Sequence, residues 1–186
     1  MAAPAEAASA AYLLPRHVGP WSLDDVLSLP EDNSQRIELV DGMLLVSPLG
    51  SYRHQSMVFD VAAGLRAACP DYLQTTIELN VLLASGRLVI PDFTVVTPRE
   101  VGVMFPVSDV VLVGEVFSPS TRLNDQGLKR ELYAEAGVKY YMMVDPEPEV
   151  AEATLLELQG KEYVEIAQSV NGVLEIERPF PVTIKF

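Results

Sequence analysis

Cysteine, basic side chains and long apolar segments are all scarce in this sequence. Its one cysteine, Cys69, cannot form a disulfide or a thiolate metal site within the chain, so we expect a reducing compartment. No apolar run approaches the roughly 18 residues of a membrane-spanning helix, and residues 1–11 lack the basic segment of a signal peptide. We therefore expect a cytoplasmic protein that does not associate with a membrane.

Basic residues are outnumbered two to one by acidic residues. The chain has 13 Lys and Arg against 26 Asp and Glu, for a net charge of −13. This balance opposes sequence-independent attraction to nucleic acid, whose phosphates are bound mainly by Lys and Arg. The repulsion of nucleic acid is weaker if some of the acids bind a divalent cation and if the dense acidic set between residues 147 and 177 lies away from the functional face.

The motifs of two common enzyme classes are also absent. The sequence contains neither a G-x-S-x-G turn nor a G-x-x-x-x-G-K-[ST] loop. Of the two histidines, His17 lies in the N-terminal segment. His54, near a predicted helix start, is more typical of a solvated or capping residue than of a catalyst, and we keep it only as an additional site candidate. Acyl transfer by a Ser-His-Asp triad and P-loop nucleotide hydrolysis are therefore disfavoured.

The chain has enough apolar residues for one sizeable core. Its 186 residues are 49% hydrophobic, which favours a single domain over residues 21–186 after a flexible, low-complexity lead-in over residues 1–20. A capping box at Ser22 and Asp25 predicts a short helix, and the Asp41-Gly42 turn predicts a hairpin. Apolar periodicity predicts helices over 52–68 and 125–136, strands over 72–83, 88–96, 110–117 and 139–144, and short antiparallel strands thereafter.

Two acids stand inside apolar strands, where carboxylates rarely occur without a partner. Asp92 follows Pro91, which has no N–H for a sheet ladder, and Glu115 lies within the apolar run 110–117. Two carboxylates on adjacent strands suit Mg²⁺ or Mn²⁺, which prefer oxygen ligands, so we predict that both bind one such ion. The alternatives are a surface acid at a strand kink for Asp92 and a buried ion pair with a basic side chain for Glu115.

Other side chains are candidates for the same site. Lys129 is four residues from both Asp125 and Tyr133, so the three share one helix face. In a functional role, Lys129 would stabilise the charge on a phosphate oxygen or orient the attacking water, and Asp125 or Tyr133 would support it as a neighbouring group. The alternative is that Lys129 forms an exposed ion pair with Asp125. Glu38, in an apolar strand, is either a third acid of the site or a solvent-facing residue.

Several short motifs occur in an order that is typical of one family. They are R-I-E-L-V-D-G at 36–42, Ser47-Pro48, Arg53-His54, Pro91-Asp92, E-V-F-S-P-S-T at 115–121, Asp125, Lys129, Tyr133, Gly137-Val138 and Val144-Asp145. This series resembles the Uma-two family of predicted bacterial endonucleases, long catalogued as a domain of unknown function and placed in the PD-(D/E)xK restriction-endonuclease-like superfamily.

The resemblance implies an α+β fold with a restriction-endonuclease-like αβββαβ core. That core is a mixed central sheet flanked by helices, here with an N-terminal hairpin and a C-terminal β extension. Asp92 and Glu115 match the two motif acids, and Phe117 stands at the position of the motif lysine, which Lys129 would replace from the next helix. The implied activity is Mg²⁺- or Mn²⁺-dependent endonucleolytic hydrolysis of DNA.

Two other functions stay open. A non-catalytic interaction module that keeps the nuclease fold is favoured by Phe117 and by the acidic balance, and a metal-dependent hydrolase of a small phosphorylated substrate needs no long DNA contacts. If DNA is the substrate, we expect Arg53, Arg122 and Arg130 to form a basic rim with Lys129. We also expect a homodimer through the distal strands, because two-fold dimers are the commonest oligomers and cutting both strands takes two sites.

Overall fold

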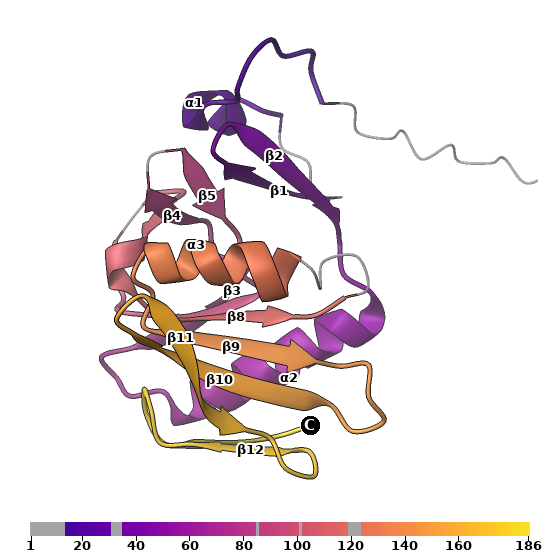
Figure 1. Ribbon diagram of the computed structural model, residues 1–186, viewed down its shortest axis with the longest axis vertical. Helices are drawn as coiled ribbons and strands as arrows, with labels where there is room; N and C mark the ends of the chain where they lie inside the picture. The colour runs from indigo at the N-terminus through magenta and orange to yellow at the C-terminus, as the bar shows by residue number, and fades with distance from the viewer. Residues whose placement is uncertain (1–13, 31–34, 85, 101, 119–123) are drawn as a thin grey trace, which may run out of the picture.

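The computed structural model describes residues 14–30, 35–84, 86–100, 102–118 and 124–186 (Figure 1). Residues 1–13 of the predicted lead-in therefore lie outside the described residues. Close to Trp21, the ring of His17 stacks on the indole with centroids 4.0 Å apart, and Trp21 N donates to Gly42 O over 2.9 Å. The division into a lead-in and a single domain stays a prediction.

A mixed six-stranded sheet forms the centre of the fold, with the strand order β11-β10-β9-β8-β6-β3. The pair β8 and β9 is parallel and the other pairs are antiparallel. The elements on and around this sheet are α2 (Tyr52–Ala68), β3 (Gln74–Ile77), β6 (Phe93–Val96), β8 (Val110–Val116), α3 (Arg130–Glu135), β9 (Tyr140–Asp145), β10 (Glu152–Gln159), β11 (Glu162–Gln168), β12 (Val173–Ile176) and β13 (Val182–Lys185). Counting only the six-stranded sheet and its two helices, the order from α2 to β9 is helix, three strands (β3, β6 and β8), helix, strand, which confirms the predicted core, and the strands from β10 to β13 confirm the C-terminal β extension.

Apolar side chains cover both faces of this sheet, as expected for a strand such as β8 in its interior. On one face, Leu65 of α2 packs with Leu112 and Met142 in a cluster that β12 and β13 complete. On the other face, Leu132 of α3 packs with Val113. Figure 1 shows the two helices on opposite sides of the sheet, with α3 in front and α2 behind. The carboxylate carried by β8 therefore lies inside a layered core.

A second, five-stranded sheet has the order β2-β1-β5-β4-β7. Its strands are β1 (Gln35–Val40), β2 (Met43–Pro48), β4 (Val81–Ala84), β5 (Arg87–Val89) and β7 (Phe105–Pro106). The predicted hairpin is confirmed, because β1 and β2 are joined by Asp41 and Gly42 at φ values of 50° and 84°. The capping box is also confirmed, since Ser22 and Asp25 bond reciprocally at the start of α1 (Leu23–Leu27).

Two segments that were each predicted to be one strand are in fact two strands, and that prediction is wrong. Each is split between the two sheets: 72–83 into β3 and β4, and 88–96 into β5 and β6. The first break lies near Glu78, whose φ of 50° turns the chain out of the extended conformation. The second lies at Pro91, which cannot donate to a ladder. Glu78 N donates to Asp92 O over 3.2 Å, so the chain crosses between the sheets twice at one place.

The helix predicted over 125–136 starts with a π-helical turn, Asn124–Lys129, which continues into α3. It ends before Gly137, which has a φ of 79° and follows the last helical turn as predicted. The helix over 52–68 is confirmed as α2, with the Ser51 side chain accepting from His54 N. Among the described helices, none is both long and apolar enough to cross a membrane.

Candidate functional site

Asp92 lies at the point where the chain passes from one sheet to the other, and its side chain is buried. Arg36 Nη1 donates to Asp92 Oδ1 over 2.7 Å, and Val116 N donates to Oδ2 over 2.7 Å. His54 Nε2 lies 3.2 Å from the same Oδ2. Burial by itself raises the pKa of Asp92, but the His54 hydrogen bond, the Arg36 charge and the Val116 amide together hold the pKa below its usual value. Asp92 is therefore an ionised acid in a buried site.

The imidazole ring of His54 is held in one orientation by Asp92 at Nε2 and by Gly50 at Nδ1. Because an ionised carboxylate only accepts hydrogen bonds, His54 Nε2 carries the proton that faces Asp92. Its Nδ1 is buried without a hydrogen-bond partner, and Gly50 packs so closely on it that a Cβ at Gly50 would overlap the ring. The structure thus places His54 against Asp92, and the expectation that it is solvated at the helix start is wrong.

Glu115 lies across from Asp92 on the neighbouring strand. Phe93 pairs with Gly114 in the β6–β8 ladder, so the next positions outward along the two strands are Asp92 and Glu115. A Cβ at Gly114 would overlap the ring of Phe93, so only glycine lets this ring pack across β8 beside the two acids. The adjacent strands therefore bring the two predicted acids together.

Lys129 and Tyr133 both donate to Glu115 Oε1, over 3.0 and 2.6 Å. Burial raises the pKa of Tyr133 well above its usual value, and the negative charges of Glu115 and Glu38 raise it further, so the phenol stays protonated as a donor. Lys129 Nζ also lies 3.2 Å from Glu38 Oε1. The side chain of Lys129 is 6% exposed, so the alternative of an exposed ion pair is wrong. The side chain of Asp125 lies outside the described residues.

Glu38 is the third acid of the cluster and not a solvent-facing residue. It is 3% exposed, and its Oε1 accepts from Ile90 N over 2.7 Å as well as facing Lys129. The Ile90 amide belongs to the segment that leads into Asp92, so Glu38 ties β1 to the crossing between the sheets. Lys129 is thereby fixed between two carboxylates from different sheets.

Arg36 is the site residue to which the sequence analysis assigned no role. It precedes Glu38 by two residues on β1, so the two side chains share one face of the strand. Beyond its bond to Asp92, Arg36 Nη2 donates to Glu78 Oε1 over 3.0 Å. Burial lowers the pKa of Arg36, but the charge and hydrogen bond of Asp92, the charge of Glu115 and the hydrogen bond to Glu78 together outweigh it, and the net shift is upward. The period-two spacing of Arg36 and Glu38 was the available signal.

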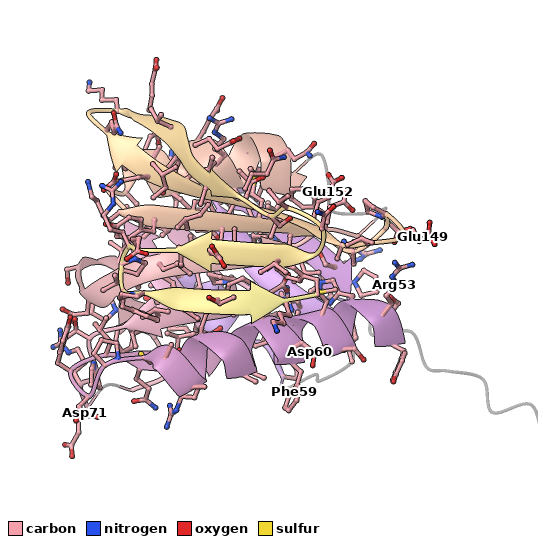
Figure 2. All side chains as sticks on the ribbon, turned by 90° about the horizontal axis from the view of Figure 1, so that it is seen from below. Arg53, Phe59, Asp60, Asp71, Glu149 and Glu152 are labelled. Atoms are coloured by element: carbon pink, nitrogen blue, oxygen red, sulfur yellow. The ribbon has the colours of Figure 1, made fainter. Side chains whose placement is uncertain are left out.

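Two of the arginines predicted for a basic rim contact other parts of the molecule. Arg53 Nη2 donates to Pro148 O over 3.1 Å, and Figure 2 shows Arg53 beside the loop that carries Glu149. Arg130 Nη2 donates to Tyr163 O on β11 over 3.0 Å. Arg122 lies outside the described residues. Neither Arg53 nor Arg130 forms a described bond with the acid cluster, and the basic rim stays a prediction.

The donor chemistry of the site suits a hard divalent ion, but its present arrangement does not expose both acids to one. Asp92 and Glu115 offer oxygen ligands of the kind that Mg²⁺ and Mn²⁺ prefer. However, Asp92 Oδ1 is bound by Arg36, and Glu115 Oε1 by Lys129 and Tyr133. Within the described residues, no three Asp, Glu, His or Cys side chains converge as a metal site requires. Arg36 would compete with an ion for Asp92 Oδ1.

Comparisons with known proteins agree with this architecture. The structure is similar to a solved structure titled "Crystal structure of a putative nuclease belonging to DUF820 from Anabaena variabilis ATCC 29413", with a TM-score of 0.61 and 19% sequence identity over 79% of this chain and 84% of that chain. At this identity the likeness shows the fold. No curated protein matches the sequence. A family model described as "Putative restriction endonuclease" matches residues 23–185, and the chain therefore belongs to the Uma2 family.

Proposed function

We propose that the protein is a metal-dependent nuclease that hydrolyses phosphodiester bonds of DNA endonucleolytically. The observation that carries the proposal is the pair of buried acids, Asp92 and Glu115, at facing ends of adjacent strands with Lys129 beside them. A buried cluster of carboxylates, a lysine and a tyrosine is costly to maintain in a core, and such clusters are typical of functional sites. Membership of a family whose model is described as "Putative restriction endonuclease" supports the same activity.

Each side chain has a distinct part in the proposed chemistry. Asp92 and Glu115 are the groups that would hold Mg²⁺ or Mn²⁺. A bound ion of this kind polarises a phosphoryl oxygen and lowers the pKa of a water. His54 and Val116 N orient Asp92 by binding its Oδ2, and Tyr133 orients Glu115 through its Oε1. Lys129 supplies the positive charge that stabilises a phosphate oxygen as charge develops on it.

The proposal is tested by a plasmid-nicking assay with purified protein in Mg²⁺ or Mn²⁺. Wild-type protein is expected to convert supercoiled plasmid to the open circle, and Glu115→Gln is expected to be inactive at matched concentration. Isothermal titration with Mn²⁺ provides an independent reading, because Asp92→Asn is expected to abolish binding. Nicking that persists in Glu115→Gln would mean that the activity does not come from this site.

A second candidate function is a non-catalytic interaction module. Two observations favour it: Arg36 and Lys129 already pair with the three buried carboxylates, and Phe117 is buried at the motif lysine position with its N–H bonded to Val144 O over 2.8 Å. Failure of the wild type both to bind Mn²⁺ and to nick DNA would favour this candidate. A metal-dependent hydrolase of small phosphorylated substrates is distinguished by turnover of a generic phosphodiester, such as bis(4-nitrophenyl) phosphate, without plasmid nicking.

We also propose that the protein forms a homodimer. The distal strands, which we expected to form the contact, expose less apolar surface than their sequence suggested. Leu155 and Met142 are fully buried in the chain's own core, so they are not available for a contact between subunits. Exposed apolar side chains occur at Val164 on the distal edge strand β11 and, away from the distal strands, at Phe59 on α2, which points outward in Figure 2, and at Ile77 on the other edge strand, β3. Light scattering after size exclusion should report a dimer mass for the wild type and a monomer mass for Phe59→Glu; monomeric wild type would refute the proposal.

A further inference from the structure

Glu78 has a backbone conformation that glutamate rarely adopts. Among the described residues other than glycine, only Asp41, Glu78 and Asn171 have a positive φ. Aspartate and asparagine tolerate this region because their short side chains bond to the nearby backbone, whereas glutamate lacks that advantage and glycine would have no strain there. A residue that is held in a strained conformation points to a role for its side chain.

Glu78 faces Asp92 where the chain crosses between the sheets. Ile77 pairs with Phe93 at the end of the β3–β6 ladder, and one position further on Glu78 N donates to the Asp92 carbonyl oxygen over 3.2 Å. Like charges in such facing positions repel, so the two acids need a cation between them. Arg36 supplies it from the other sheet: its Nη1 donates to Asp92 Oδ1 over 2.7 Å and its Nη2 to Glu78 Oε1 over 3.0 Å. One guanidinium group therefore bridges both carboxylates.

The two contacts fix the orientation of the Arg36 guanidinium. Its N–H groups form a rigid planar fork, so a carboxylate that holds Nη2 also decides where Nη1 points. The Glu78 side chain is 45% exposed, whereas the side chains of Arg36 and Asp92 are 16% and 3% exposed. The orientation of a buried contact at Asp92 thus depends on a carboxylate that solvent reaches.

We propose that Glu78 is a positioning residue that holds Arg36 on Asp92 Oδ1 and so limits the access of Mg²⁺ or Mn²⁺ to that oxygen. The proposal rests on the proposed metal-dependent function. Without the Glu78 carboxylate, the Arg36 fork loses one of its two anchors and competes less well with an ion for Oδ1. Loss of Glu78 also removes a negative charge, which by itself weakens the binding of a cation, but solvent screens an exposed charge and this effect is the smaller one.

The test is the affinity for Mn²⁺, measured by isothermal titration in two backgrounds. In the otherwise wild-type protein, Glu78→Gln is expected to raise the affinity about three- to fivefold, which is the size of one partly exposed ion-pair contact. In the Arg36→Gln protein there is no guanidinium to release, so the same substitution is expected to leave the affinity unchanged or to lower it. The matched control is Glu175→Gln, at an exposed position on β12, which is expected to bind Mn²⁺ as the wild type does.

Glu78→Gly separates the positioning role from a structural one. Glycine relieves the strained φ, so the thermal midpoint should stay unchanged or rise, while the affinity for Mn²⁺ rises as in Glu78→Gln. Wild-type affinity in both Glu78 variants, or the same fold-change with and without Arg36, would overturn the proposal. Plasmid nicking by a protein whose Mn²⁺ affinity does not respond to Glu78 would refute the positioning role alone. An Arg36-dependent response to Glu78 without nicking would refute the nuclease alone.

Discussion

Replacing Lys129 with methionine tests whether the acid cluster is held together as the contacts indicate. Lys129 is 5% exposed and lies 3.0 Å from Glu115 and 3.2 Å from Glu38. Methionine keeps most of the side-chain volume but removes the one ammonium between two buried carboxylates. Removing one partner of a buried ion pair costs about 3–5 kcal/mol, because the remaining charge is left without compensation. We expect Lys129→Met to lower the free energy of unfolding by this amount at neutral pH.

Urea denaturation followed by circular dichroism measures this loss. With a slope of about 2 kcal/mol per molar urea, a loss of about 3–5 kcal/mol moves the midpoint downward by about 1.5–2.5 M. Lys161→Met is the matched control, because Lys161 is exposed in the turn between β10 and β11, and we expect its effect to stay within about 0.5 kcal/mol.

A second variant separates loss of charge from loss of packing. In the double variant Lys129→Met with Glu115→Gln, one of the two side chains that lose the ammonium is neutral, so we expect this protein to be more stable than Lys129→Met alone. The reasoning would be refuted if Lys129→Met unfolded at the wild-type urea midpoint, or if Glu115→Gln made the Lys129→Met protein less stable still. Either result would mean that Lys129 does not compensate these acids in the folded protein.

Three further predictions concern the same junction between the sheets. Gly114→Ala should destabilise the protein by about 1–3 kcal/mol in the same urea assay, because the new Cβ would overlap the ring of Phe93; an unchanged midpoint would contradict the packing. The pKa of Asp92 is lower in the folded protein than in the unfolded chain, where it is about 3.9, so the ionised Asp92 stabilises the folded state. This stabilisation is complete above the unfolded pKa and is lost as the pH falls through the lower folded pKa. In Asp92→Asn, the free energy of unfolding should therefore fall less steeply as the pH is lowered below about 4. An equally steep fall would show that Asp92 is not the group responsible. Arg36→Gln frees Asp92 Oδ1 and should raise the affinity for Mn²⁺ about tenfold by isothermal titration, whereas unchanged or weaker binding would show that Arg36 does not compete with an ion.

Local patterns in the sequence predicted the components of the fold. The Asp41-Gly42 turn, the capping box at Ser22 and the periodicity of residues 52–68 depend on interactions within a few positions, and all three are confirmed. Asp92 and Glu115 were recognisable because a carboxylate within an apolar run must find a partner. These features need no knowledge of what lies opposite them in the folded chain.

The breaks in the long strands could not be predicted in the same way. Apolar alternation continues from Ile77 through Leu79 to Val81, although the chain leaves one sheet and joins the other between them. The two strands that flank the crossing each bury one face most completely, at Thr75 in β3 and at Val81 and Leu83 in β4, so a period-two pattern is present on either side of the crossing. Only the packing of two sheets against each other decides where a strand ends.

The partners within the site were decided by tertiary structure alone. Arg36 reaches Asp92 across 56 positions of sequence and His54 reaches it across 38, and neither separation leaves a local signal. Lys129 was expected either to pair with Asp125 on its own helix or to serve the site, and the fold places it between Glu38 and Glu115 from two different sheets. The sequence determined which side chains needed partners, because burying a polar group has a cost that residue type alone reveals. The folded chain determined which partners they found, because that depends on the register and packing of strands far apart in sequence.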